Sequence, residues 1–294
     1  MAVHPENRAL VVVPTYDEAD NIGELLDRLH LAAPDVQVLV VDDASPDGTA
    51  HLVRERAART SGLHLLERAS KDGLGAAYRA GFRWALDRDY DVIAQMDADL
   101  SHPPESLARL IGALAGAPDT PLAAADLAIG SRYVPGGSVA DWSPLRRQLS
   151  RFGNLWVRHV LDLHVADSTA GFRAYTREAL LRVGAADTTS DGYCFQIENT
   201  WRAQRRGLRV VEVPIAFTDR ASGSSKMSIG IAAEALGRSL QWRWGELVAR
   251  PEGVGTDIVA PPCPPPRSTS DRDSVSGHLA ILPSRPTYDA PSWR

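Results

Sequence analysis

The chain has 294 residues, of which 44% are hydrophobic and 23% charged, and its net charge is −5. These values are typical of a folded protein with one large or two small domains, and the negative charge argues against nucleic acid as a partner. The two cysteines lie far apart without metal-ligand spacing. Neither a signal peptide nor a run of 18 apolar residues occurs, so we expect a cytoplasmic protein without a membrane span.

Short apolar runs alternate with helical patterns along the first half of the chain. Strands are expected at residues 9–14, 36–41, 63–67, 91–96 and 127–130, and helices at 19–31, 49–59, 73–86 and 105–114. This alternation predicts an α/β fold with a mostly parallel central sheet and helices on both faces. In such sheets, ligands bind at the carboxyl ends of the strands.

The second half of the chain is less regular. Helices are expected at 144–163, 195–206 and 229–247, and a strand at 210–217. Nine of the chain's 20 prolines fall in the last 44 residues. Because proline interrupts helices and central strands, we expect a folded domain over residues 1–248 and a disordered, proline-rich tail over 249–294.

An Asp-x-Asp pair, Asp97 and Asp99, follows the strand expected at 91–96. Such a pair can hold Mg²⁺ or Mn²⁺ against a diphosphate, because hard cations prefer oxygen ligands and bridge carboxylates to phosphates. A simple surface turn would give the same pattern. Ser101 is placed to touch the metal directly or through water, whereas His102 is better suited to shaping the turn.

Two further polar segments follow expected strands at the same edge of the sheet. Tyr16 could stack on a nucleobase, and Asp17 or Glu18 could accept a hydrogen bond from a ribose or base. An ordinary polar loop with acids at a helix start is the alternative. Asp42 could bind a nucleotide or could satisfy loop amides together with Asp43. The shared placement of these segments and Asp97 predicts one site.

The remaining motifs concern phosphate binding. Gly73-Leu-Gly75 opens a helix but lacks the third glycine of a dinucleotide fingerprint and the Gly-Lys-Ser/Thr of a P-loop, which argues against an oxidoreductase and against ATP hydrolysis. Arg132 follows a strand and offers a fork of donors to phosphate oxygens. Arg220 and Lys226, on a glycine- and serine-rich loop, could close over a diphosphate or lie on a solvated surface.

Six segments together resemble the family 2 glycosyltransferases of the GT-A fold, and more narrowly the dolichol-phosphate (polyprenol monophosphate) mannosyltransferases. They run in the family's order at residues 13–22, 41–49, 71–78, 96–105, 130–133 and 217–227. The resemblance implies a GDP-mannose donor, a polyprenyl or dolichyl phosphate acceptor, and Mg²⁺ or Mn²⁺. In-line attack by the acceptor phosphate implies inversion and a β-linked product.

The resemblance also assigns roles to individual residues. The guanosine pocket would be lined by Pro14, Tyr16, Glu18, Val40 and Asp42. Ribose, diphosphate and metal would face Asp97, Ala98 and Asp99, with Asp99 the direct metal ligand and Ser101 a further contact where some relatives carry Gln. Phosphates would contact Arg132, Arg220 and Lys226, and the catalytic residues would be Asp99 and Arg132.

The acceptor is a lipid, so a contact with the inner face of the membrane is expected. Arg146, Arg147 and Arg151, beside Trp142 and Phe152, are candidates for a membrane-facing acceptor entrance. The alternative is a core-packing helix with a solvated basic face. Some relatives carry transmembrane helices that this chain lacks, so a membrane protein could supply its anchor.

Two other functions remain open at this point. The same chemistry could use UDP-glucose or an aminosugar nucleotide as donor. Alternatively, the chain could be a non-catalytic, nucleotide-sugar-binding partner of a membrane complex, which the intact Asp97–Asp99 pair disfavours.

Overall fold

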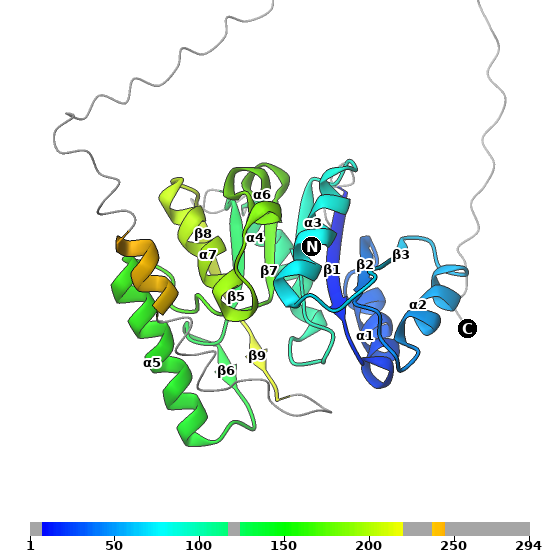
Figure 1. Cartoon of the computed structure of the whole chain (residues 1–294), viewed down its shortest axis with the longest axis horizontal. Coiled ribbons are helices and arrows are strands. Elements are labelled where there is room, and N and C mark those ends of the chain that lie inside the picture. Colours follow the sequence, from blue (N-terminus) through cyan, green and yellow to red (C-terminus); the bar gives the residue numbers. More distant parts are fainter. Residues whose placement is uncertain (1–7, 117–123, 220–236, 245–294) are drawn as a thin grey trace, which may run out of the picture. The chain divides into compact units, whose positions relative to one another are not determined.

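A seven-stranded sheet forms the centre of the computed structural model, which describes residues 8–116, 124–219 and 237–244 (Figure 1). Its order is β3-β2-β1-β4-β7-β5-β8. The strands are β1 (Ala9–Thr15), β2 (Val36–Asp42), β3 (Leu63–Glu67), β4 (Val92–Gln95), β5 (Leu127–Ser131), β7 (Arg173–Thr176) and β8 (Val210–Pro214). Neighbouring strands are parallel except that β7 runs antiparallel to β4 and β5. The mostly parallel α/β sheet is confirmed.

The helices of the first half connect these strands as the hydrophobic pattern predicts. They are α1 (Ala19–Ala32), α2 (Thr49–Ala57), α3 (Leu74–Leu86) and α4 (Leu107–Ala115), with a 3₁₀ turn, η1 (Pro104–Ser106), before α4. The predicted boundaries differ from the observed ones by about two residues or less. These differences arise because apolar periodicity shows that a helix is present more reliably than it shows where the helix ends.

The second half holds elements that the sequence did not predict. Helix α5 (Pro144–Leu161) was expected, and α7 (Gly192–Arg205) begins three residues earlier than expected. The elements β6 (Ser138–Val139), β7, α6 (Arg177–Val183) and η2 (Ala185–Asp187) were not predicted. They are short, so contacts with neighbouring elements rather than a local pattern determine them.

The single strand expected at 210–217 is wrong, because β8 ends at Pro214 and β9 (Ala216–Phe217) pairs instead with β6. Ile215 joins the two sheets: its N–H donates to Ser131 O, and its own carbonyl accepts from Ser138 N, both at 3.0 Å. Of the helix expected at 229–247, residues 237–244 are described and are helical. The proposed tail lies outside the described residues, so its boundary stays a prediction.

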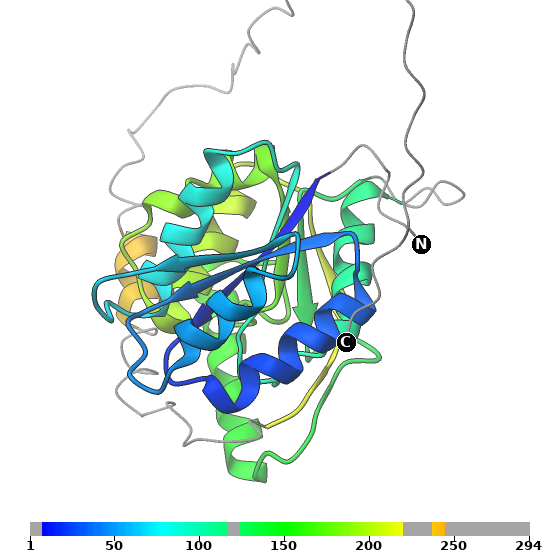
Figure 2. The ribbon, with the colours of Figure 1, turned by 90° about the vertical axis from the view of Figure 1, so that its right-hand side faces the viewer.

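Helices cover both faces of the sheet, as predicted (Figure 2). Alternate residues of β1 face opposite sides: Val11 and Val13 join a core cluster with α1 and α4, whereas Leu10 and Val12 join one with α3, α6 and α7. All four side chains are buried. A strand buried on both faces explains why this segment reads as a continuous apolar run.

The strand order brings the carboxyl ends of three strands to one edge of the sheet. Because β1 lies between β2 and β4, and all three are parallel, their carboxyl ends meet at the same edge of the sheet. The strand order reverses at this edge, because β2 and β3 lie on one side of β1 and β4 lies on the other. Open α/β sheets bind ligands at such a position.

Candidate active site

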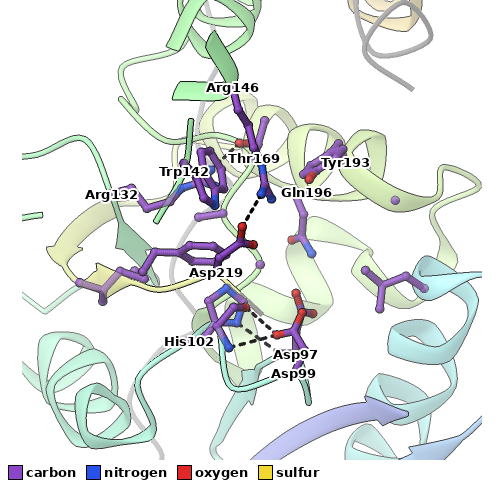
Figure 3. Close-up of a pocket in the computed structure, with 18 residues that line it drawn as sticks. Asp97, Asp99, His102, Arg132, Trp142, Arg146, Thr169, Tyr193, Gln196 and Asp219 are labelled. Atoms are coloured by element: carbon purple, nitrogen blue, oxygen red, sulfur yellow. Dashed lines mark hydrogen bonds and ion pairs between the residues drawn. The ribbon is translucent and has the colours of Figure 1, made fainter. Parts of the chain in front are cut away.

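Two adjoining cavities open at this edge of the sheet. The larger, of about 240 Å³, is lined by residues from the β4–η1 loop, α5, the segment before β7 and α7 (Figure 3). The smaller, of about 140 Å³, is lined by residues from β1, its following loop and the start of α3. Asp97, Asp99 and Leu74 line both cavities. The acid pair therefore stands where the two cavities meet.

Asp97 is held by two contacts that fix the loop after β4. Its Oδ1 accepts a hydrogen bond from the Tyr78 hydroxyl at 2.8 Å, and its backbone N–H donates to His102 Nδ1 at 3.3 Å. The His102 ring is buried between Phe172 and Phe217, with centroids 5.4 Å from each. Burial lowers the pKa of His102, so the ring is neutral and Nδ1 can accept. His102 therefore shapes the turn, as expected.

Asp99 is buried beside Ser101; both residues are predicted to contact the metal together with Asp97. Ser101 donates to Asp99 Oδ1 through its hydroxyl at 2.6 Å and its backbone N–H at 3.2 Å. Between them, Leu100 has φ = 60°, a conformation that costs energy for a residue with a Cβ and that often marks functional loops. The tight loop holds both carboxylates at the junction of the cavities.

The charges around the larger cavity favour a bound cation. Among the described residues, its charged lining consists of Asp97, Asp99, Asp219, Arg132 and Arg146 and is net negative, so these side chains by themselves would repel a diphosphate that carries no metal. Within the described residues, no group of three His, Cys, Asp or Glu side chains could hold an ion. Two carboxylates can hold Mg²⁺ or Mn²⁺ when phosphate oxygens and water complete the coordination, which is the usual arrangement for Mg²⁺ at phosphate substrates.

The residues predicted to line the guanosine pocket divide into two groups. Pro14, Tyr16 and Glu18 line the smaller cavity. Lys71, which was not predicted as a site residue, lines it too and places its ammonium 3.4 Å from the Tyr16 ring centroid. This cation–π contact stabilises the position of the aromatic ring.

Val40, Asp42 and Ala98 line neither cavity. The side chains of Val40 and Ala98 lie in the core. Asp42 is buried and accepts from the Thr15 and Ser45 hydroxyls at 2.8 and 2.6 Å, and from Ser45 N–H at 2.9 Å. This carboxylate therefore organises the loop, while the neighbouring Asp43 reaches the smaller cavity.

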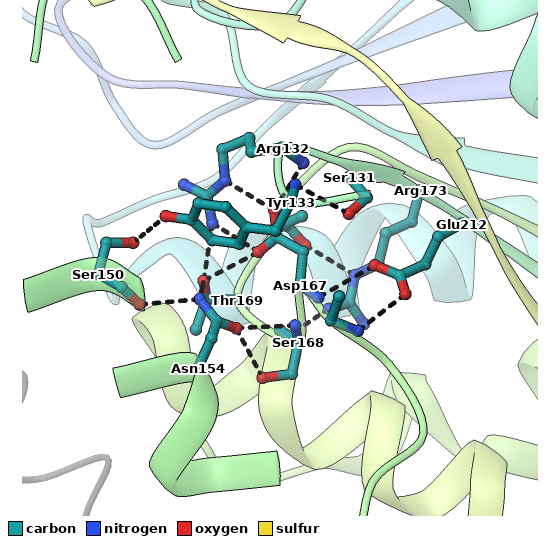
Figure 4. A network of polar contacts seen from close by, with 12 residues as sticks. Ser131, Arg132, Tyr133, Ser150, Asn154, Asp167, Ser168, Thr169, Arg173 and Glu212 are labelled. Carbon is teal, nitrogen blue, oxygen red and sulfur yellow. Dashed lines mark hydrogen bonds and ion pairs between the residues drawn. The ribbon is translucent and has the colours of Figure 1, made fainter. Parts of the chain in front are cut away.

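Arg132 lies in a buried polar network (Figure 4). Its Nε and Nη2 donate to the two oxygens of Asp167, each at 2.7 Å, and Nη2 also donates to Thr169 Oγ1 at 2.8 Å. Burial alone would lower the pKa of Arg132 and raise that of Asp167. Their ion pair outweighs burial, so the pKa of Arg132 is raised and that of Asp167 lowered. Both groups stay charged.

Arg146 is a second cation at the larger cavity. Its Nη1 lies 2.8 Å from Asp219, and its guanidinium stacks 4.1 Å above the Trp142 ring. Arg146 and Trp142, predicted candidates for a membrane-facing acceptor entrance, both line the larger cavity, and their contact with a membrane stays a prediction. Arg220 and Lys226 lie outside the described residues, so their predicted phosphate contacts stay predictions.

The glycines of the 71–78 segment serve packing between helices. A Cβ at Gly73 would lie 1.8 Å from Asp191 Oδ2, and one at Gly75 would lie 2.7 Å from Ser190 O. The Gly75 N–H donates to the Asp191 carboxylate. The start of α3 is therefore occupied by a side chain from the start of α7.

Sequence reasoning missed several residues of the larger cavity. Thr169 and Gln196 line it, and Asp167 pairs with the lining residue Arg132; all three lie in segments without a recognisable motif, and only the fold brings them to the cavity. Three buried N–H donors of this cavity have no hydrogen-bond partner among the described residues: Trp142 Nε1, Arg146 Nε and Gln196 Nε2. A ligand with several oxygen acceptors would satisfy them.

The chain is similar in sequence to several known proteins. The model of glycosyl transferase family 2 matches residues 10–184. A polyprenol monophosphomannose synthase from Mycolicibacterium smegmatis is 49% identical over 253 residues, 86% of this chain and 93% of the relative. An undecaprenyl-phosphate mannosyltransferase from Micrococcus luteus is 47% identical over 247 residues, 83% and 98% of the two chains.

A solved mannosyltransferase from Pyrobaculum calidifontis, in complex with GDP-Man and Mn²⁺, has a similar fold, with a TM-score of 0.51 at 20% identity over 86% of this chain and 68% of that one. The sheet and this likeness show the GT-A fold. The chain belongs to glycosyl transferase family 2. The predicted family and enzyme class are confirmed.

Proposed function

We propose that this glycosyltransferase transfers mannose from GDP-mannose to a polyprenyl phosphate and releases GDP. Relatives at 49% and 47% identity whose names specify mannose transfer to polyprenol or undecaprenyl phosphate support the sugar and the acceptor. The observation that carries the proposal is the acid pair shared by two cavities. A diphosphate at Asp97 and Asp99 would place its nucleoside in one cavity and its sugar in the other.

The reaction joins an acceptor phosphate oxygen to the sugar C1 and breaks the C1–O bond to GDP. A phosphate monoester is anionic at neutral pH, so the nucleophile needs no general base. In-line attack inverts C1 and gives a β-linked product from an α-linked donor. Bound Mg²⁺ or Mn²⁺ would neutralise the charge that develops on the departing diphosphate.

The protein's own groups hold the reacting partners. Asp97 and Asp99 would orient the metal–diphosphate group, and Tyr16 would stack on the base. Arg132 and Arg146 lie across the larger cavity from the acid pair and would attract the acceptor phosphate (Figure 3). Because each arginine already pairs with an aspartate, neither can donate its whole fork to phosphate. Arg220 and Lys226 are proposed to supply the remaining positive charge.

Helix α5 is proposed to contact the lipid surface that carries the acceptor. Its exposed side includes Leu145, Leu149, Phe152 and Leu155, with exposures of 75%, 43%, 57% and 63%. Arg147, Arg151 and Arg158 are also exposed on this helix. Apolar side chains beside a row of arginines match an anionic membrane interface. Among the described residues, no helix combines the length and apolar character needed to cross a bilayer.

Replacing both Leu149 and Phe152 with serine is expected to weaken binding to vesicles of anionic phospholipid at least tenfold, because each apolar side chain contributes on the order of 1.5–3 kcal/mol on burial. Vesicle co-sedimentation measures this. The matched control is Leu31→Ser on α1, whose side chain is 82% exposed, and it should bind like wild type. Equal binding by the double variant would argue against α5 as the contact.

The function itself is tested with radiolabelled donors. Protein, polyprenyl phosphate and Mg²⁺ or Mn²⁺ are incubated with GDP-mannose or with UDP-glucose, and labelled lipid is extracted and counted. Transfer from GDP-mannose, abolished by excess chelator, is the expected result. Transfer from UDP-glucose alone would reject the mannose assignment. Nucleotide-sugar binding without transfer to any acceptor would favour a non-catalytic partner.

A further inference from the structure

Gln196 lines the larger cavity but has no role in the reaction proposed above. It lies in the second turn of α7, is 2% exposed, and lines the larger cavity together with Asp97 and Asp99. Figure 3 shows its side chain extending from α7 toward the side of the cavity that holds the acid pair. Arg132 and Trp142 occupy a different side in the same view.

A chain of hydrogen bonds sets the orientation of the Gln196 amide. Gln95 Nε2 donates to the carbonyl of Gly171 at 2.8 Å and to Gln196 Oε1 at 2.9 Å. The Gly171 carbonyl can only accept, so it fixes which end of the Gln95 amide faces it. The Gln95 NH₂ group can only donate, so the group of Gln196 that faces it must be the oxygen. Gln196 Nε2 is left without a hydrogen-bond partner among the described residues.

A buried donor without a partner is unfavourable, and native proteins keep few of them. Gln95 Oε1 also lacks a partner, but Gln95 does not line the cavity. Gln196 does, and a ligand oxygen there would satisfy its amide. The site therefore favours a ligand with an acceptor oxygen close to the Asp97–Asp99 pair.

We propose that Gln196 Nε2 donates a hydrogen bond to an oxygen of the transferred hexose, and so positions the sugar and contributes to donor specificity. The inference rests on the proposed function, in which the diphosphate lies at the acid pair and the sugar follows it into the larger cavity. A neutral amide suits a neutral hydroxyl. The charged acceptor phosphate is better matched by Arg132 and Arg146.

Gln196→Met tests this role, because methionine keeps the length of the side chain and removes the Nε2 donor, together with the oxygen that accepts from Gln95. With Mg²⁺ present, the affinity for GDP should stay unchanged, while kcat/KM for GDP-mannose should fall about 10- to 100-fold, the cost of losing a hydrogen bond at a buried polar site. The KM for polyprenyl phosphate should stay constant. The preference for GDP-mannose over GDP-glucose, its C2 epimer, should narrow. Titration calorimetry and initial rates supply these values.

Thermal unfolding separates this role from a structural one. The unliganded Gln196→Met protein loses one hydrogen bond, from Gln95 Nε2, which keeps the Gly171 carbonyl as its other acceptor, so its Tm should fall by less than that of a variant that loses two. The matched control is Gln204→Met on the same helix. Gln204 accepts from His164 N–H at 2.8 Å and donates to Asp162 O, so this variant should lower Tm and leave donor selectivity unchanged.

Gln196→Asn provides a second variant, since it withdraws the amide by one methylene and should show the same selective loss. An unchanged kcat/KM for GDP-mannose in a folded variant would overturn the proposal. A rise in the acceptor KM with unchanged donor parameters would assign the amide to the phosphate and also overturn it. Failure of the wild-type protein to use GDP-mannose would instead reject the proposed function, which keeps the two failures distinct.

Discussion

Asp99→Asn is expected to lower kcat for mannose transfer about 100- to 1000-fold, comparable to the loss of one electrostatic group at a reacting centre. Asparagine keeps the size of the side chain and an oxygen that can accept from Ser101, so the loop should stay folded. It removes the negative charge that would hold the metal against the diphosphate. Initial rates over a range of Mn²⁺ concentrations, with Tm recorded in parallel, measure the effect.

The matched control for this substitution is Asp141→Asn. Asp141 is exposed, next to a residue of the cavity wall, and has φ = 59°, a conformation that asparagine tolerates well. Its rate and metal dependence should equal those of wild type. Wild-type turnover by Asp99→Asn at low Mn²⁺ would contradict the assignment of Asp99 as a metal ligand.

Asp167→Leu is expected to lower the free energy of unfolding by about 3–5 kcal/mol, because it leaves the Arg132 guanidinium buried without its carboxylate partner. Both partners are buried, and two hydrogen bonds of 2.7 Å join them. Adding Arg132→Met should restore much of the lost stability, since the uncompensated charge disappears. Urea denaturation of the single and double variants measures both effects.

The same pair predicts a pH dependence. The pKa of Asp167 in the folded protein lies below its ordinary value of 3.8, so its stabilising contribution is complete above that pH and is lost as the pH falls through the lowered pKa. Relative to the double variant, the free energy of unfolding of the wild type should therefore fall only at acidic pH. Equal stability of Asp167→Leu and wild type at neutral pH would contradict the structural role of the pair.

The two predictions distinguish an effect on catalysis from an effect on folding at the larger cavity. Asp99 stands at the meeting point of both cavities, so its removal should affect catalysis more than folding. Asp167 lies behind Arg132 and should affect folding first. Arg132 combines both roles, which makes its single substitution harder to interpret than either aspartate.

Periodicity and strand-end placement predicted much of this fold and part of the site. The first five strands follow short, mostly apolar segments, and residues just after β1 and β4 line the cavities. The short elements β6, β7 and α6 were missed because contacts, not a local pattern, stabilise them. Asp42 illustrates the limit for the site: its position after β2 was identified, but the side chain turns to Ser45 and Thr15 instead of a cavity.

What the sequence alone determined is the family, the parallel α/β framework and the Asp97–Asp99 pair, because each can be recognised from short segments, even where several such segments lie far apart in the chain. Only the tertiary structure decided which distant side chains meet them. The Arg132–Asp167 pair and the Gln95–Gln196 contact join residues 35 and 101 positions apart. The antiparallel strand β7 brings such segments together, and pairing across a sheet leaves no periodic signal in either segment by itself.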